Sequence, residues 1–316
     1  MAKYSDIHGI KVQYRESDAT AIEGDVWYNA STGLLKMYSG VGAWSTGGNL
    51  TTARHSLAGA SSGTQTAALA MGGDPDTVES EEYNGSTWAE GGDLNTGRQD
   101  FKGAGTQTAG LAFGGYSTAN HDETEEYNGT SWTNGGDMTT ARRELSGCGT
   151  QTAGFAFSGQ ISAPQTDSET YNGTAWTEAA ELNTERSEHP AGFGTTTAAV
   201  CAGGEVGPPT VNSETYDGTS WAEGSNLNAV KSNTIGAGIQ TSGMAISGNP
   251  SNSTAVEVYD GTSWAETTDV STGRHNLAAA GSQGVAAVAY GGNTGSSAAA
   301  TEEWTSTATI QTVAFD

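Results

Sequence analysis

Basic residues are rare in this 316-residue chain, yet six of the twelve recur at one position of a repeated pattern. A glutamate recurs equally regularly, two residues before a tyrosine or tryptophan. The basic column is Arg54, Arg98, Arg142, Arg186, Lys231 and Arg274, and the acidic column is Glu81, Glu125, Glu169, Glu214, Glu257 and Glu302. A ring of guanidinium groups would bind an anionic ligand. We favour structural ion pairs, because such a ring would not need a matching acid in every repeat.

Metal binding is the second chemistry that these residue types suggest. A Ca²⁺ site needs several oxygen atoms converging on one point, and a further column with one oxygen per repeat, such as Asp93 and Asp137, does not supply it. Asp74, Asp76 and Asp122 lie in short acidic segments and are weak candidates. The five histidines lack the spacing of zinc ligands. We therefore expect neither a metal nor another cofactor.

Catalytic constellations are the third possibility. We find no nucleophile, acid–base pair or phosphate loop, so we expect that the protein is not an enzyme. Cys148 and Cys201 stand where other repeats have alanine, which favours packing over a disulfide or a metal site.

The elements that position these residues are set by a repeat. Six tryptophans from Trp44 to Trp264 are spaced 43 to 45 residues apart, and the last five close a phrase such as Tyr83-Asn-Gly-Ser-Thr-Trp88. Asn-Gly and Asp-Gly between apolar runs are strong hairpin signals. A second block follows each basic residue, with two small or apolar runs separated by a turn resembling Gly-Thr-Gln-Thr and ending in Gly-Gly or Ser-Gly.

Four short strands in a period of this length are typical of a propeller blade. The sequence therefore predicts an all-β fold, a six-bladed kelch-like β-propeller with four antiparallel strands per blade and a short N-terminal extension. The kelch resemblance covers residues 50–304 and depends on the double glycine, the Glu-x-Tyr, the tryptophan and the basic residue. Here the spacing from tyrosine to tryptophan is shorter than in most kelch repeats, and two copies have Ser-Gly.

The resemblance also implies two enzyme classes to be weighed. Some kelch propellers are copper radical oxidases with a Cys–Tyr crosslink, and neither cysteine here lies in a tyrosine-bearing segment. Six-bladed sialidases carry a Ser-x-Asp-x-Gly-x-x-Trp turn, which the adjacent Asp217 and Gly218 do not match. A propeller glycosidase or oxidase is therefore a remote alternative.

The chain ends must close the ring. We predict residues 1–44 as an extension with a hairpin and the ring-closing strand, and residues 45–316 as the propeller. The strand of Trp44 would complete the sixth blade, with the tail 309–315 as its rival. If Trp44 closes the ring, the tail can pair with the hairpin 25–38.

The charge narrows the class of partner. A net charge of −24 repels nucleic acid and anionic membranes, and no segment is long enough to span a membrane or to act as a secretory signal. Residues 23–38 resemble hairpins near the ends of structural proteins of tailed, marine-type bacteriophages. We therefore expect a virion protein, made in the host cytoplasm, that binds other virion proteins through residues 1–44.

Binding to a host is expected on the loops between the second and third strands. These loops diverge, whereas the turns on the other face are nearly identical, and recognition usually lies on diverse loops carried by a rigid frame. Drift in unconstrained loops would look the same. The candidate contacts for a host-surface glycan or protein are Asp74, Asp76, Tyr116, His121, Asp122, Gln160, Gln165, Glu205 and Asn249. A cellular kelch module for protein–protein interaction is the alternative, and a homo-oligomer stays open.

Overall fold

The computed structural model describes residues 13–15, 26–39, 42–306 and 309–312 of the chain. It forms two compact units, one of residues 44–304 and one drawn from residues 1–43 and 305–316. The tail therefore groups with the N-terminal segment, whereas the sequence-based boundary assigned it to the propeller. The reason is a strand pairing described below.

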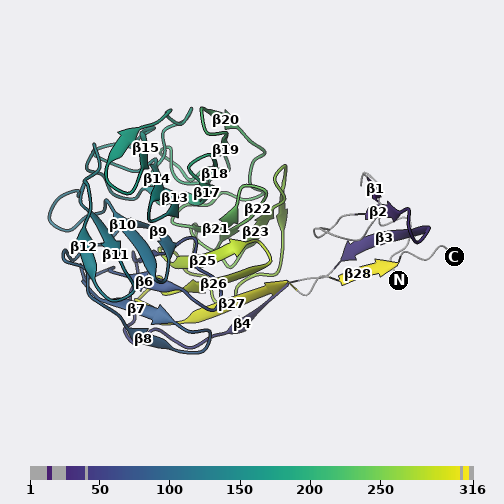
Figure 1. The fold of residues 1–316 in the computed structure, drawn as a ribbon, viewed down its shortest axis with the longest axis horizontal. Helices are drawn as coiled ribbons and strands as arrows, with labels where there is room; N and C mark the ends of the chain where they lie inside the picture. Colours follow the sequence, from purple (N-terminus) through teal and green to yellow (C-terminus); the bar gives the residue numbers. More distant parts are fainter. Residues whose placement is uncertain (1–12, 16–25, 40–41, 307–308, 313–316) are drawn as a thin grey trace. The chain divides into compact units, whose positions relative to one another are not determined.

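The larger unit confirms the predicted fold, a ring of six four-stranded antiparallel sheets with no helix among the described residues (Figure 1). The first strands of neighbouring blades contact one another in a closed circle around the axis. These inner strands are β5 (Ala58–Gly59), β9 (Lys102–Thr106), β13 (Ser146–Thr150), β17 (Ala191–Thr195), β21 (Ile235–Ile239) and β25 (Ala278–Gln283). Their small residues suit the crowded axis, as the sequence indicated.

The other strands follow outward in order in each blade. The second strands are β6 (Leu69–Met71), β10 (Ala109–Phe113), β14 (Ala153–Phe157), β18 (Ala198–Ala202), β22 (Ser242–Ile246) and β26 (Ala286–Tyr290). The third strands are β7 (Ser80–Tyr83), β11 (Thr124–Tyr127), β15 (Ser168–Tyr171), β19 (Ser213–Tyr216), β23 (Val256–Tyr259) and β27 (Thr301–Ser306). The outer strands are β8 (Trp88–Glu90), β12 (Trp132–Asn134), β16 (Trp176–Glu178), β20 (Trp221–Glu223), β24 (Trp264–Glu266) and β4 (Gly42–Thr46). We number the blades 1 to 6 in the order of β5, β9, β13, β17, β21 and β25.

The hairpin between the third and outer strands is fixed by the Asn-Gly turn. In blade 1, Tyr83 pairs with Trp88 across the turn, and Asn84 Oδ1 accepts backbone hydrogen bonds from Ser86 at 3.0 Å and Thr87 at 2.9 Å. Gly85 takes a left-handed φ of +88°, which residues with a side chain rarely adopt. The turn chemistry therefore sets the register that places each tryptophan beside its tyrosine.

The core lies between blades. Trp132 of blade 2 is 5% exposed, and its Nε1 donates to Ser80 Oγ of blade 1 at 3.1 Å. Leu111 and Phe113 of blade 2 likewise pack in one cluster with Trp176 of blade 3. Each seam between blades is thus a small hydrophobic core closed by an aromatic side chain.

The ring closes through β4, which lies beside β27 as the outer strand of blade 6. Trp44 packs against Trp304 with ring centroids 5.4 Å apart, and its Nε1 donates to Thr268 O at 3.0 Å. Blade 6 therefore takes its outer strand from the start of the chain and its other three from the end.

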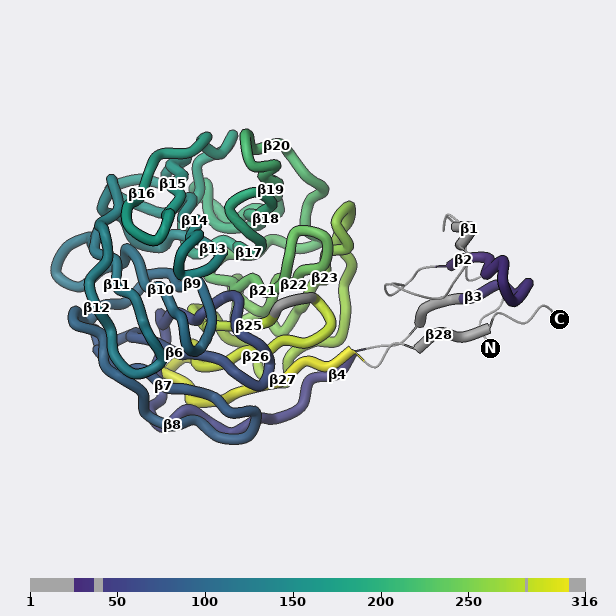
Figure 2. The backbone as a smooth tube through the Cα atoms, in the orientation of Figure 1, coloured from purple at the N-terminus to yellow at the C-terminus, as the bar shows by residue number. Residues whose placement is uncertain are grey.

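The smaller unit is a separate sheet of four strands in the order β1 (Gln13–Arg15), β2 (Val26–Asn29), β3 (Leu34–Ser39) and β28 (Thr309–Thr312). The strand β28 pairs antiparallel with β3, with Thr309 opposite Ser39. The tail therefore pairs with the hairpin that follows residue 25, as expected if Trp44 closes the ring (Figure 1). Figure 2 shows the ring-closing strand β4 beside β27. Of the segment 1–44 that is predicted to bind other virion proteins, residues 1–12, 16–25 and 40–41 lie outside the described residues.

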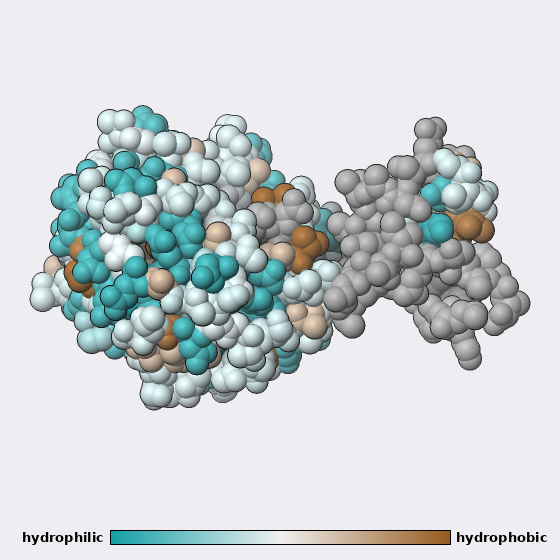
Figure 3. Space-filling view, turned by 60° about the horizontal axis from the view of Figure 1, so that its bottom comes forward, coloured by the Kyte–Doolittle hydropathy of each residue, from teal (hydrophilic) through white to brown (hydrophobic). Residues whose placement is uncertain are grey.

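The face of the propeller seen in Figure 3 is mainly polar. Figure 3 shows hydrophilic and neutral side chains over the face in view, with small scattered apolar patches. Among the described residues, no helix is long and apolar enough to cross a membrane.

Candidate functional site

The basic and acidic columns lie buried inside the blades. The five arginines of the column are at most 1% exposed, and so is Lys231. Each arginine reaches the acidic-column glutamate of its own blade, as Arg98 Nη2 does with Glu125 Oε1 at 3.0 Å. The ion pairs are Arg54–Glu81, Arg98–Glu125, Arg142–Glu169, Arg186–Glu214 and Arg274–Glu302.

Each glutamate also binds the segment that connects the outer strand of the preceding blade to the first strand of its own blade. Glu125 accepts backbone hydrogen bonds from Asn95 at 2.6 Å and Thr96 at 3.2 Å, in addition to Arg98. A buried charge needs a partner and further hydrogen bonds to offset its desolvation, and this arrangement supplies both. Lys231 differs, because its Nζ donates to Ala255 O at 2.8 Å and feels Glu257 only as a nearby charge.

The buried basic side chains also hold the ends of the loops above them. Arg186 donates to Gly203 O and Asn212 O, one on each side of the loop after β18, at 3.2 and 2.9 Å. Arg274 does the same with Gly291 O and Ala300 O. The buried columns thus fix the ends of the loops between the second and third strands.

Those loops form one face of the disc, here called the loop face, and five predicted contact residues take equivalent places on it. Each directly follows the Gly-Gly or Ser-Gly pair after the second strand, and forms an isolated bridge with the residue that follows the basic column. The bridges are His55 with Asp74, Gln99 with Tyr116, Arg143 with Gln160, Ser187 with Glu205, Ser232 with Asn249, and His275 with Asn293. All five predicted residues are half-buried, so each presents part of a polar side chain to solvent.

Blades 2 and 3 carry the most developed part of this face. The Arg143 guanidinium lies over the Tyr116 ring, 5.0 Å from its centroid. Arg143 Nη1 also donates to Asn120 Oδ1 at 2.9 Å, and Asn120 Nδ2 donates to Gln160 O at 3.3 Å. Tyr116 and Gln160 are therefore brought together by Arg143, which the sequence did not single out.

The other predicted residues are more dispersed. His121 lies in the loop of Tyr116, with its ring nitrogens bonded to Glu123 at 2.5 Å and Ser117 at 2.7 Å. Desolvation raises the pKa of Glu123 while the bond to His121 and its charge lower it, and the net direction is down. Asp122 is half-buried beside them.

Two predicted residues lie at the margins of the loop face. Gln165 bridges to Arg186 through the backbone, and Asp76 is exposed in a left-handed conformation. Among the described residues, no group of three or more histidine, cysteine or acidic side chains is placed to hold a metal ion.

A circle of residues that the sequence analysis missed surrounds the axis on the same face. Its members are Ser56, Asp100, Glu144, Glu188, Asn233 and Asn276. Each lies two positions after its basic-column residue, with φ between 49 and 59°. Their backbones are joined from blade to blade, for example from Asp100 N to Ser56 O at 3.0 Å and from Glu144 N to Asp100 O at 2.8 Å. The steps from His189 N to Glu144 O, Asn233 N to Glu188 O, Asn276 N to Asn233 O and Ser56 N to Asn276 O close the circle.

Charge in this axial circle is concentrated on blades 2 to 4. His189 Nε2 lies 3.3 Å from Asp100 Oδ1. Burial is the largest single influence on Asp100 and raises its pKa, but the hydrogen bond and charge of His189, with smaller contributions, make the net shift downward. Burial raises the pKa of Glu144, and the charge of Glu188 adds to the rise. Burial also raises the pKa of Glu205, again with a contribution from Glu188. A signal for the circle was present in the sequence, since all six positions are polar.

Below the circle, Lys102 lines a cavity of about 10 Å³ with residues of five blades, among them Ser56, His189, Thr234 and Asn276. The side chain is 6% exposed, and its Nζ has no hydrogen-bond or ion-pair partner in the part of the chain that the structure describes. Burial lowers the pKa of Lys102 to about 8. Every other blade has a small or aliphatic residue at this position.

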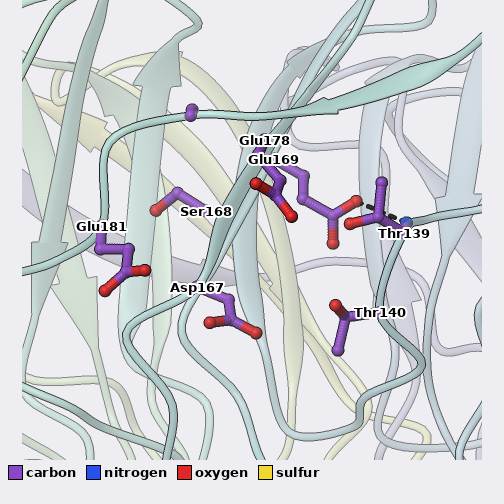
Figure 4. A pocket seen from close by; sticks show the side chains of 8 residues that line it. Thr139, Thr140, Asp167, Ser168, Glu169, Glu178 and Glu181 are labelled. Carbon is purple, nitrogen blue, oxygen red and sulfur yellow. Dashed lines mark hydrogen bonds between the residues drawn. The ribbon is translucent and has the colours of Figure 1, made fainter.

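Figure 4 shows a different pocket, of about 100 Å³, at the outer side of blade 3. Its acidic lining is Asp167, Glu169, Glu178 and Glu181. Glu169 is already bonded to Thr139 N at 2.6 Å and to Arg142 at 2.7 Å. In blade 2 the equivalent of Thr139 is an asparagine, whose longer side chain reaches Asn134 and Trp132 O. In blade 3 the shorter Thr139 side chain lines the pocket instead.

Comparison with known proteins adds the fold alone. No family model and no curated protein sequence matches the chain. Among the solved structures that match is one described as "Structure of YjhT", with a TM-score of 0.68 and 12% sequence identity, covering 83% of this chain and 99% of that chain. The chain is similar in fold to that protein and belongs, by its own structure, to the six-bladed β-propellers.

Proposed function

We propose that this protein is a non-enzymatic binding module of a virion, a tail-fibre, tail or capsid surface protein. The loop face engages a host-surface glycan or protein, and the unit drawn from residues 1–43 and 305–316 binds other virion proteins. The binding role is supported by a contrast within the loop face: the ends of the loops are held rigidly, whereas the loop sequences diverge from blade to blade. The buried ion pairs of the two columns hold the loop ends. Half-exposed tyrosine, histidine and amide side chains lie in the loops themselves.

The chemistry of the loop face suits a neutral, polar ligand. Tyr116 offers an aromatic face already stacked on Arg143, and Gln160 and Asn249 offer amides close to solvent. Aromatic and amide side chains together bind sugar rings and peptide backbones without needing a charged ligand. Glu205 and Asp74 add acceptors for hydroxyl groups.

The virion assignment has two supports. The first is the similarity of residues 23–38 to hairpins of phage structural proteins. The second is the acidity of the chain, with a net charge of −24 that disfavours nucleic acid as a partner. The alternative is a kelch-type module for protein–protein interaction inside a cell. In that case the protein would bind its partner through the same loop face but would not be part of a virion.

The experiment compares particle incorporation with host binding. Deletion of residues 1–24 should remove the protein from purified particles, and the double variant Tyr116→Ala, Gln160→Ala should leave incorporation intact but reduce binding to host cells or a glycan array at least tenfold. Thr130→Ala, in a turn on the opposite face, is the matched control. Retention of full binding by the double variant overturns the binding face. Absence of the protein from particles, with capture of a soluble cellular partner, favours the alternative.

A further inference from the structure

The seam between blades 3 and 4 departs from the repeat at three positions that elsewhere join neighbouring blades. The first is a glutamine in the turn between the first two strands. Gln107 Nε2 of blade 2 donates to Ala68 O and Tyr83 O of blade 1, at 3.1 and 2.7 Å. Gln151 of blade 3 and Gln240 of blade 5 make the same pair of bonds to the blade before them.

Blade 4 has Thr196 at this position, and its side chain is too short to reach. The corresponding acceptors are the carbonyl oxygens of Gly154 and Tyr171, by alignment with Gly110 and Tyr127 one blade earlier. Among the described residues, no side chain donates a hydrogen bond to either oxygen. One amide nitrogen with two hydrogens would serve both acceptors, as glutamine does at the three seams described above.

The second position concerns the tyrosine hydroxyl. Tyr127 and Tyr171 donate to the blade before them, to Glu82 at 2.7 Å and Glu126 at 2.6 Å. In the next blade Tyr216 faces Thr170 where the earlier blades have a glutamate. Tyr216 is 4% exposed, and its hydroxyl has no hydrogen-bond partner within the described part of the chain.

The third position is a glycine at the earlier seams and an alanine at this one. At the earlier seams a glycine makes room for the hydroxyl, and a Cβ on Gly91 or Gly135 would lie 3.0 or 2.7 Å from the oxygen of Tyr127 or Tyr171. Ala179 occupies this place beside Tyr216. The alanine methyl group therefore lies in space that, at these earlier seams, receives the hydroxyl of Tyr127 or Tyr171.

These changes meet in one groove of about 500 Å³, lined by Thr152, Thr170, Tyr171, Asn172, Thr196 and Tyr216 among others. We propose that this groove binds an extended peptide segment of a partner protein that inserts a glutamine side chain. The amide nitrogen of that glutamine donates to the oxygens of Gly154 and Tyr171, and a peptide carbonyl accepts from Tyr216. The lining turns lie on the face opposite the loop face, so this site is independent of the proposed host-binding face.

The probe that tests this site is a copy of the chain's own turn, the capped peptide Gly-Thr-Gln-Thr-Ala. Binding to the full-length protein is followed by NMR chemical-shift changes on the peptide. The peptide should bind with millimolar affinity, and replacing its glutamine by norleucine should weaken binding at least tenfold. N-acetylglucosamine serves as a glycan probe and should not compete.

Matched variants locate the site. Thr196→Gln restores the internal glutamine and should abolish peptide binding, while raising Tm by about 2–4 °C through the recovered hydrogen bonds. Thr196→Val, similar in size to threonine, should bind as the unmodified protein does. No binding at about 10 mM peptide, equal binding of the norleucine peptide, unchanged binding by Thr196→Gln, or displacement by the sugar would each overturn the proposal.

Discussion

Lys102 has no charged partner among the described residues, so we predict that replacing it raises the free energy of unfolding. Most substitutions in a protein core lower it. Its side chain is 6% exposed in the axial cavity, and burial lowers its pKa from 10.5 to about 8. Replacing it by methionine keeps the unbranched shape and removes the charge. We therefore expect Lys102→Met to be more stable than the unmodified protein at neutral pH.

The size of the gain follows from the two pKa values. The difference between 10.5 in the unfolded chain and about 8 in the folded protein, at 1.36 kcal/mol per pH unit, is about 3 kcal/mol. Below pH 8 the amine is charged in both states, so folding carries the full cost of burying it. Between pH 8 and 10.5 the folded state is already neutral, and the cost disappears as the unfolded chain also loses its proton. The gain should therefore be greatest below pH 8 and small above pH 10.5.

The assay is chemical denaturation of both proteins at pH 7 and pH 10.5, with tryptophan fluorescence as the signal. Lys231→Met is the contrasting control, because it removes the cation nearest the buried Glu257 and should destabilise at pH 7. The reasoning about Lys102 fails if Lys102→Met is no more stable than the unmodified protein at pH 7. It fails equally if the gain persists unchanged at pH 10.5.

Three further predictions concern contacts between and within blades. Glu125→Gln should lower the free energy of unfolding by about 3–5 kcal/mol, because it leaves the buried Arg98 without its anion; a loss under 1 kcal/mol in urea denaturation would contradict this. Tyr127→Phe should cost about 1–2 kcal/mol through its bond to a carboxylate, and Tyr216→Phe almost nothing; equal losses in the same assay would refute the seam analysis. Trp44→Ala should cost about 3–5 kcal/mol and lower Tm measured by calorimetry, whereas an unchanged Tm would show that β4 is dispensable for closure.

The repeat made the fold predictable because every blade contains the same local sequence signals. The Asn-Gly turn specifies a hairpin, the tryptophan marks the outer strand, and six copies fix the number of blades. The position of Trp44 as the ring-closing strand followed from counting strands at the two chain ends. The domain boundary placed the tail in the propeller, whereas β28 pairs with β3 of the smaller unit, the pairing expected for the case in which Trp44 closes the ring.

The candidate sites were less accessible from sequence, for a physical reason. Contacts between blades join residues about 40 positions apart, so the effect of Thr196 is felt at Gly154 and Tyr171 of the preceding blade. A departure from the repeat is visible in sequence, but which acceptor loses its donor is not. The same holds for Lys102, whose isolation is evident only once five blades surround it.

The use of β4 to complete blade 6 has a consequence for synthesis of the chain. This strand leaves the ribosome first among those of the ring, and its partner β27 is nearly the last. Until residues 301–306 emerge, the growing arc presents an unpaired edge at each end, and exposed edges promote aggregation. The final disc can therefore assemble only after residue 306 has been translated, and termination before that point would yield an open crescent with no means of sealing itself.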